Sequence, residues 1–116
     1  MRYVLLINLD KAAPPRREAE LEAILDGHKR FEDELQSAGK ARLVHTERLR
    51  PEKEAIRVRL DAGRPQVTDG PFAETKEVLG GLYVIECDTR DEAVEWAKKL
   101  LLRGDRTVEV RPIWPR

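Results

Sequence analysis

The alternation of apolar and polar residues along the chain predicts six strands and two helices. The strands are expected at residues 3–9, 42–49, 55–60, 66–68, 82–87 and 107–113. The first and fifth of these segments are apolar at both odd and even positions, which is typical of central strands covered on both faces. The other segments are short or alternate, as in strands that keep one polar face.

The two helices show apolar residues three or four positions apart. In residues 16–38 this apolar stripe has charged residues on its other sides, and Gly39 is a natural C-terminal stop. The second helix begins at a capping box, with Thr89 at the N-cap and Glu92 at N3. It is expected to run to about residue 102, before Gly104.

The order of these elements predicts a single α+β domain over residues 1–116, a ferredoxin-like β-α-β-β-α-β sandwich with a short inserted strand or loop. Residues 42–49 and 55–60 are expected to form an antiparallel hairpin. In the second of these strands the apolar positions should point into the core, namely Ile56, Val58 and Leu60. Two helices cover one face of a sheet, so the apolar second face predicts a homodimer packed sheet to sheet.

Composition restricts the partners and the location. The 22 Lys and Arg residues balance the 22 Asp and Glu residues, so no net charge attracts nucleic acid or an anionic membrane. The longest apolar run, residues 4–7, is too short to cross a bilayer, and no signal peptide precedes it. The single cysteine, Cys87, excludes an internal disulfide and suits a reducing, cytoplasmic location. Neither zinc-ligand spacing nor a phosphate-binding glycine loop occurs, so we expect neither metal nor cofactor.

One segment, residues 68–77, differs from the rest of the chain. Its sequence is Thr-Asp-Gly-Pro-Phe-Ala-Glu-Thr-Lys-Glu, in which ionisable and hydroxyl side chains crowd around Phe72. Asp-Gly-Pro predicts a turn, and Gly80 and Gly81 predict a β-bulge or a close backbone approach. The interpretation without chemistry is an Asx turn at Asp69 followed by a solvated rim.

Two histidines offer acid–base chemistry, and each has a structural alternative. His28 lies on the apolar stripe of the first helix, as either a core histidine or a general acid or base at the edge of a cleft. His45 and Glu47 share a strand face with Leu43 and Leu49, as either a proton-transfer pair or part of an exposed edge. Cys87 lies in an apolar strand, where a thiol is usually inert.

Residues 67–77, Val-Thr-Asp-Gly-Pro-Phe-Ala-Glu-Thr-Lys-Glu, followed by Leu-Gly-Gly at 79–81, resemble the signature of the YCII-related superfamily in its DGPF-motif branch. Residues 1–7 and 108–113 also resemble that branch, so the resemblance covers nearly the whole chain. It implies a ferredoxin-like dimer, the dimeric α+β barrel. Members are often encoded beside extracytoplasmic-function sigma factors, and one relative of the YCII branch is a dehydrochlorinase in chlorinated-aromatic breakdown.

The YCII branch has a proposed His–Asp pair as its active site, and the resemblance carries over only half of it. His28 matches the histidine by its distance from Gly39, whereas the place of the aspartate falls near Leu100, which cannot serve. Asp69 is the substitute if residues 68–77 fold over the first helix.

Two hypotheses follow. The first is a small cofactor-free enzyme for proton transfer, elimination or isomerisation on a small organic molecule, with His28 and Asp69 as catalytic residues. Its substrate-binding residues would be Phe72, Glu47, Glu74 and Lys76. The second is a non-catalytic dimeric module that binds a ligand or a partner such as a sigma factor.

In the second hypothesis residues 68–77 are a structural lock. Asp69 would cap a turn, and Glu74 or Glu77 would pair with Arg111 on a neighbouring strand.

Overall fold

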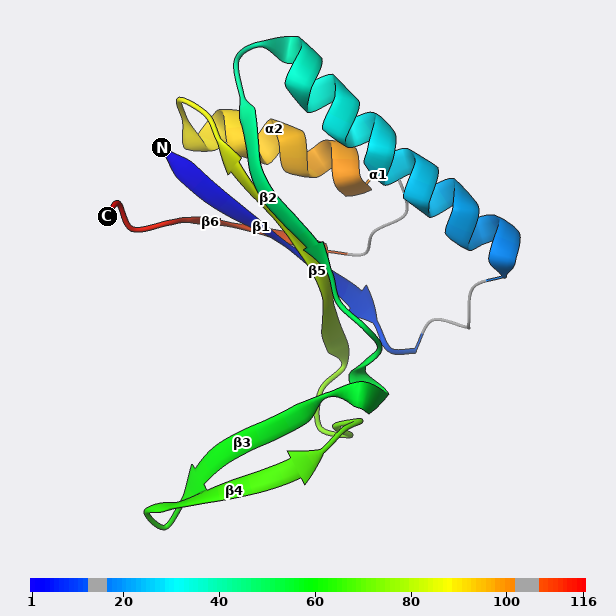
Figure 1. The fold of residues 1–116 in the computed structure, drawn as a ribbon, viewed down its shortest axis with the longest axis vertical. Coiled ribbons are helices and arrows are strands. Elements are labelled where there is room, and N and C mark those ends of the chain that lie inside the picture. The colour runs from blue at the N-terminus through cyan, green and yellow to red at the C-terminus, as the bar shows by residue number, and fades with distance from the viewer. Residues whose placement is uncertain (13–16, 102–106) are drawn as a thin grey trace.

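Two helices pack on one face of a four-stranded antiparallel sheet in the computed structural model of the chain, which describes residues 1–12, 17–101 and 107–116 (Figure 1). The sheet has the order β2-β5-β1-β6 and contains β1 (Arg2–Asp10), β2 (Arg42–Arg48), β5 (Glu77–Glu86) and β6 (Thr107–Pro112). The helices are α1 (Glu18–Ala38) and α2 (Arg90–Leu101). The expected α+β class is confirmed, and the strand order is consistent with a ferredoxin-like fold.

The helix ends follow the signals in the sequence wherever the structure describes them. Gly39 ends α1 in the left-handed conformation, with φ at 69°. Thr89 Oγ1 accepts the backbone N–H of Glu92 at 3.2 Å, and Glu92 Oε2 accepts the backbone N–H of Asp88 at 3.2 Å. The predicted helix ends at residues 16 and 102, with Gly104, lie outside the described residues.

The core lies between the helices and the inner face of the sheet. Its largest fully buried side chains are Phe31, Leu5, Leu35, Ile85 and Leu100. The Phe31 ring meets Tyr83 and Trp96 edge to face, with centroids 5.0 and 5.9 Å apart. All buried residues of α1 fall between Gly27 and Leu35, so its C-terminal half is the part packed into the core.

The hairpin of this molecule is not the one expected from the sequence. β2 pairs with β5, whereas β3 (Ile56–Asp61) pairs with β4 (Arg64–Asp69) in a separate two-stranded sheet. The short 3-10 helix η1 (Glu52–Glu54) redirects the chain between β2 and β3. Ala62 and Gly63 form the two-residue loop with φ values of 51° and 78°, and positive φ at both positions suits the right-handed twist of a hairpin.

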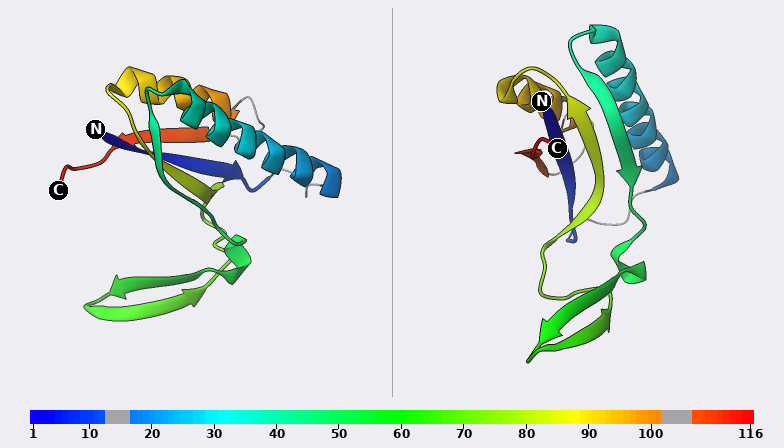
Figure 2. Two further views of the ribbon diagram at one scale, coloured as in Figure 1. Left: turned by 45° about the horizontal axis from the view of Figure 1, so that its top comes forward. Right: turned by 60° about the vertical axis from the view of Figure 1, so that its left-hand side comes forward.

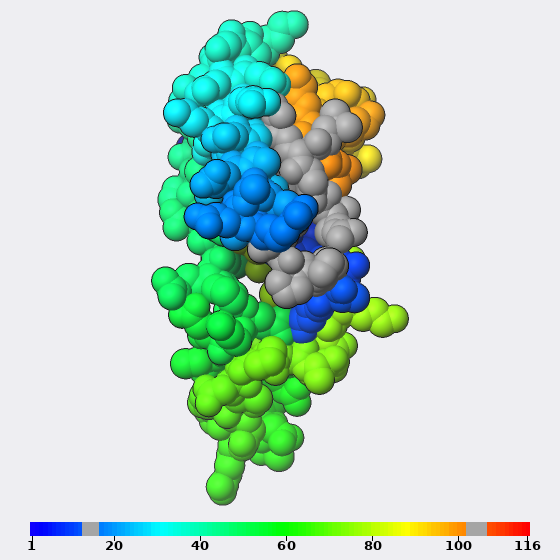
Figure 3. All heavy atoms as spheres, turned by 90° about the vertical axis from the view of Figure 1, so that its right-hand side faces the viewer, coloured from blue at the N-terminus to red at the C-terminus, as the bar shows by residue number. Residues whose placement is uncertain are grey.

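The apolar face of β3 is exposed, so the expectation that it points into the core was wrong. Ile56, Val58, Leu60 and Val67 on β4 are 65%, 66%, 75% and 68% exposed. The hairpin leaves the end of the main sheet and extends away from both helices (Figures 1 and 2). Seen from the side of α1, it forms a narrow extension below the helical layer (Figure 3). Neither helix therefore covers it.

The main sheet has an outer face opposite the helices (Figure 2). The strand register places four half-buried apolar residues on it, here called the outer stripe: Val4, Leu6, Leu82 and Val84. The central strands are thus apolar on both sides, as their sequence pattern indicates, and the second copy expected to cover this face stays a prediction. No helix among the described residues is long and apolar enough to cross a membrane.

Candidate functional site

A cleft of about 970 Å³ opens between α1 and the inner face of the sheet. Its apolar lining comes from both layers: Ile7, Leu9, Leu21, Ile24, Leu25, Val78 and Leu79. Its rim is formed by residues 46–54, which include η1. The cleft exists because the N-terminal half of α1 lies beyond the packed part of the helix. Its size is that of a site for a small organic molecule.

His28 lies in the wall of this cleft and is half-buried. Its Nδ1 is 3.0 Å from the hydroxyl of Tyr83, and the two rings stack with centroids 5.9 Å apart. Tyr83 is buried on the inner face of β5 and also lines the cleft. The Tyr83 ring also packs edge to face with Phe31 of the core. The structure thus places an oriented imidazole beside a phenol at an apolar cleft, which suits acid–base chemistry.

Residues 68–77 fold around an ion pair, here called the Lys11–Glu52 lock. Lys11 Nζ donates to Glu52 Oε1 at 2.7 Å, and also to the Phe72 carbonyl and the Thr75 hydroxyl. The same carboxylate oxygen accepts the backbone N–H of Phe72. The Glu52 side chain is only 10% exposed. The hydrogen bond from Lys11, followed by that from Phe72, holds the pKa of Glu52 below its ordinary value.

Gly70 is required at its position by space. Its backbone N–H donates to the Ala55 carbonyl at 2.8 Å, which ties the end of β4 to the start of β3. A Cβ on Gly70 would overlap the carbonyl oxygen of Glu52. The glycine of the Asp-Gly-Pro turn therefore permits the close approach of the chain to η1.

Gly80 and Gly81 mark the irregularity that the sequence predicts. The register between β1 and β5 shifts after Ile7, opposite this glycine pair. A Cβ on Gly80 would lie 2.5 Å from Cδ1 of Leu9, and one on Gly81 would lie 2.9 Å from the Glu47 carbonyl oxygen. Both the predicted bulge and the predicted close approach are confirmed.

The residues predicted as a site lie in two separate places. His28 and Glu47 line the cleft, whereas Asp69, Phe72, Glu74 and Lys76 are not among its lining residues. Asp69 is exposed at the end of β4, paired in register with Ile56. Within one chain the structure therefore does not bring Asp69 to His28.

The side chains of residues 68–77 instead bind the hairpin. The Arg57 guanidinium lies 3.7 Å from the centroid of the Phe72 ring and forms an ion pair with Glu74. This hydrogen bond from Arg57 lowers the pKa of Glu74. Of the two expected partners of Arg111, Glu74 is wrong, because it pairs with Arg57 from the adjacent hairpin. The pairing of Glu77 with Arg111 stays a prediction; Arg111 lies near Glu109, at 3.8 Å.

His45 and Glu47 form the expected pair, but on an exposed edge. Their Nε2 and Oε1 atoms are 3.4 Å apart, and both side chains are about 60% exposed. A β-bulge between Leu43 and His45 separates them from Leu43, which packs against the core. The expected common face from Leu43 to Leu49 was therefore wrong, since the bulge reverses the side on which His45 lies.

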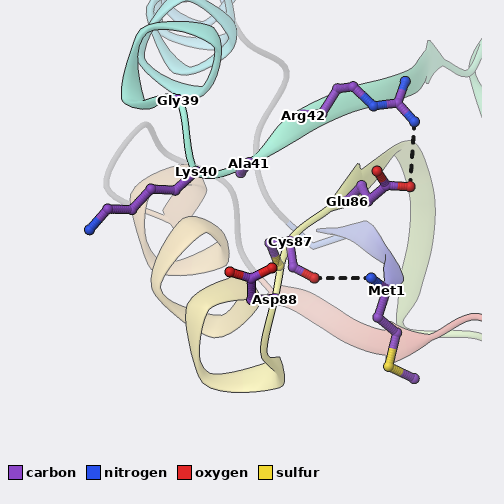
Figure 4. Close-up of a pocket in the computed structure, with 8 residues that line it drawn as sticks. All are labelled: Met1, Gly39, Lys40, Ala41, Arg42, Glu86, Cys87 and Asp88. Carbon is purple, nitrogen blue, oxygen red and sulfur yellow. Dashed lines mark hydrogen bonds and ion pairs between the residues drawn. The ribbon is translucent and has the colours of Figure 1, made fainter.

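A second recess, of about 240 Å³, lies at the other end of the sheet (Figure 4). There the amino group of Met1 donates to the Cys87 carbonyl at 3.2 Å, and Arg42 lies 3.4 Å from Glu86. Burial raises the pKa of the Cys87 thiol, which fits an inert cysteine. No group of His, Cys, Asp or Glu within the described ranges is arranged to hold a metal ion. The cleft is therefore the better candidate site.

Three side chains of these two regions were not predicted from the sequence. They are Tyr83, which contacts His28, and the ion pair of Lys11 and Glu52. Tyr83 occupies an inward-facing position on an apolar strand, so its burial beneath the helices could have been predicted from the sequence. Lys11 and Glu52 gave no signal, because each occurs in a polar connector and the two are 41 residues apart.

The chain matches a protein-family model along its whole length and a known protein along part of it. The family model of the YCII-related domain matches residues 1–116. Over 68 residues the chain is 47% identical to the uncharacterised protein R00369 of Rhizobium meliloti (strain 1021). That match covers 57% of this chain and 55% of the relative, so it spans about half the length of each.

Proposed function

The chain belongs to the family of YCII-related domains, and we propose that it is a small cofactor-free enzyme that moves a proton on a small, mainly apolar organic molecule. The observation that carries this proposal is the 3.0 Å contact between His28 and Tyr83 in the wall of the apolar cleft. An imidazole nitrogen can both accept and donate a proton, which is the chemistry that general acid–base catalysis requires.

In the proposed reaction His28 removes a proton from a carbon next to an electron-withdrawing group of the substrate. Loss of a leaving group then gives elimination, and return of the proton elsewhere gives isomerisation. Tyr83 is a positioning residue, because its hydroxyl fixes the orientation of the imidazole. The apolar lining makes the surroundings of the reacting atoms less polar than bulk water, which strengthens the electrostatic contacts there.

Polar groups at the rim would orient the substrate. Arg48 pairs in register with Gly81 on the inner face of the sheet, and it lines the cleft with Glu47. A cation at the mouth of an apolar cleft suits a molecule with one polar or anionic end. The proposal gives Asp69, Phe72, Glu74 and Lys76 no catalytic step.

The proposed functional unit is a homodimer, the dimeric α+β barrel of the resemblance. The outer stripe supports it, since four apolar side chains on the exposed face of a sheet need a partner surface.

The test is solvent-deuterium exchange into a panel of small cyclic ketones, lactones and chlorinated lactones, followed by NMR. The protein is expected to catalyse exchange at the carbon next to the carbonyl, and His28→Ala should reduce the rate by about 10²–10⁴-fold. Tyr83→Phe should reduce it less. Exchange by the His28→Ala variant at the unaltered rate would remove the proposal.

A second candidate is a non-catalytic module that binds a ligand or a protein partner such as a sigma factor. The observation that favours it is the folding of residues 68–77, the signature segment. There Glu74 and Phe72 contact Arg57, and Thr75 accepts a hydrogen bond from Lys11. Chemical-shift changes of cleft residues on adding the same panel, with no deuterium exchange for any compound, would favour this module.

A further inference from the structure

We propose that the β3–β4 hairpin is an intermolecular arm whose apolar face docks on a second copy of this chain. The arm face is defined by Ile56, Val58, Leu60 and Val67. The inference concerns assembly and does not depend on the chemistry of His28.

The arm face is a continuous apolar surface. Val58 and Val67 are directly paired across the two strands, with Ile56 and Leu60 on either side of Val58 along β3. Side chains two apart on a strand share a face, so all four point the same way. Each is about two-thirds exposed, and no described part of the chain packs over them. A monomer rarely leaves a patch of this kind open to water.

The opposite face of the hairpin is polar. It carries Arg57, Arg59, Gln66 and Thr68. The arm face is apolar except for Asp69, which lies opposite Ile56 at its base, and the other face is polar. This is the pattern of a sheet that is covered on one side. The sequence is therefore that of a half-buried hairpin, whereas within one chain nothing buries it.

The base of the arm is fixed to the main domain. Gly70 binds the Ala55 carbonyl, Arg57 lies over Phe72, and the Lys11–Glu52 lock holds the connecting segment against β1. An isolated two-stranded hairpin is marginally stable in water. This anchoring sets the direction of the arm and presents its apolar face at a defined place.

The occupant that the molecule indicates is a second copy. The hairpin extends on the side of the outer face, away from the helices, so the hairpin and the outer face of the sheet border the same open space (Figures 1 and 2). A stable interface buries about 1,200–2,000 Å² in total. The outer stripe alone offers four side chains that are already half-buried, which is too little. In a two-fold dimer that uses both surfaces, each copy contributes its arm face and its outer stripe, so each surface occurs twice in the interface.

The length of the arm fits this role. Its strands have six residues each, which corresponds to a reach of about 20 Å at 3.3 Å per residue. Four strands spaced about 4.8 Å apart are roughly 15 Å across from first to last. An arm of this length can cross the sheet of the partner.

The charges around the outer stripe also favour a second copy. Arg111 and Glu109 lie opposite Val4 and Leu6 on β6, and His45 and Glu47 lie opposite Val84 and Leu82 on β2. The β6 edge thus carries both signs, and the chain has a net charge of zero. A surface with mixed charges can complement a copy of itself, whereas a polyanion or an anionic membrane selects a surface of one sign.

The test replaces the cross-strand apolar pair by a charged pair, Val58→Glu with Val67→Lys, which keeps a favourable contact across the strands. The matched control is Arg59→Lys with Gln66→Glu, the next pair in register on the polar face. Analytical ultracentrifugation should show a dimer for the unaltered chain, at least 100-fold weaker association for the first variant and a change below threefold for the control. Circular dichroism confirms that both variants are folded.

A second measurement needs no variant. A sample that mixes isotope-labelled and unlabelled chains should show nuclear Overhauser effects between different copies from the methyl groups of Val58, Leu60 and Val67. Their absence in a dimeric sample overturns the arm, as does a dimer that the first variant leaves intact. A chain that is monomeric at all concentrations overturns it too.

Discussion

The cleft and the signature segment, residues 68–77, both contain ionisable groups beside an aromatic ring, yet their surroundings are opposite. In the signature segment Phe72 and Glu74 are held by Arg57, and Thr75 is held by Lys11. In the cleft the imidazole of His28 lies against Tyr83 at the edge of an open apolar space.

The difference shows that a dense group of charged residues in a sequence is a poor guide to a reactive site. Charges that are close in sequence readily pair with one another or with a neighbouring strand, and pairing removes their chemical freedom. A single titratable group on an apolar face has a greater effect on chemistry, because its surroundings are weakly polar.

The largest expected effect is on activity, where a substitution in the cleft is compared with one in the signature segment. His28→Asn is expected to slow the deuterium exchange described above by about 10²–10⁴-fold, because it removes the proposed general base. Asp69→Asn is expected to leave the rate within twofold, because Asp69 does not line the cleft. Rates are measured by NMR on both variants under identical conditions. A large loss in Asp69→Asn would mean that a second copy brings Asp69 into the cleft.

The next effect is on the free energy of unfolding, and it concerns the packing of the signature segment. Gly70→Ala places a methyl group against the Glu52 carbonyl and is expected to destabilise the fold by about 1–3 kcal/mol. Urea denaturation measures the change. The control is Gly63→Ala, where nothing lies within 4 Å and only the positive φ opposes alanine. A smaller loss in Gly70→Ala than in Gly63→Ala contradicts the close packing of the signature turn.

The Lys11–Glu52 lock predicts a loss of stability in acid. The folded-state pKa of Glu52 lies below the ordinary 4.5, so its contribution is complete above the ordinary pKa and is lost as the pH falls through the lowered one. The stability difference between the unaltered chain and Glu52→Gln should therefore be constant near neutral pH and shrink below about pH 4.5. Urea denaturation at several pH values measures it. A difference that grows in acid has the wrong sign and would refute the lock.

The smallest effect concerns the ion pair between Glu74 and Arg57. Glu74→Gln should destabilise the fold only slightly, and less in high salt, because both charges reach solvent. Glu109→Gln, at the weaker contact with Arg111, is the matched control. Urea denaturation at low and high salt compares the two. An effect of Glu74→Gln larger than that of Gly70→Ala would place Glu74 among the main determinants of the fold.

Much of the fold could be predicted because its signals are local. The cap at Thr89, the helix stop at Gly39 and the bulge at Gly80 each depend on residues within a few positions. The central strands were recognisable from their two apolar faces. These features need no knowledge of the partner strand.

The pairing of the strands and the site depended on distant contacts. The alternation in residues 55–60 fits a partner on either side, and the two-residue loop at Ala62 and Gly63 decides between them. The bulge between Leu43 and His45 contains no glycine, so the sequence does not predict it. Tyr83 is 55 residues from His28, so only the packed sheet and helix bring the two together.

Glu52 lies at the rim of the cleft and also at the foot of the hairpin. A change at this side chain therefore affects the cleft and the hairpin together. Redesign of residues 50–54 to enlarge the cleft will therefore alter the hairpin as well, and the cleft will tolerate substitutions better on α1 than on η1.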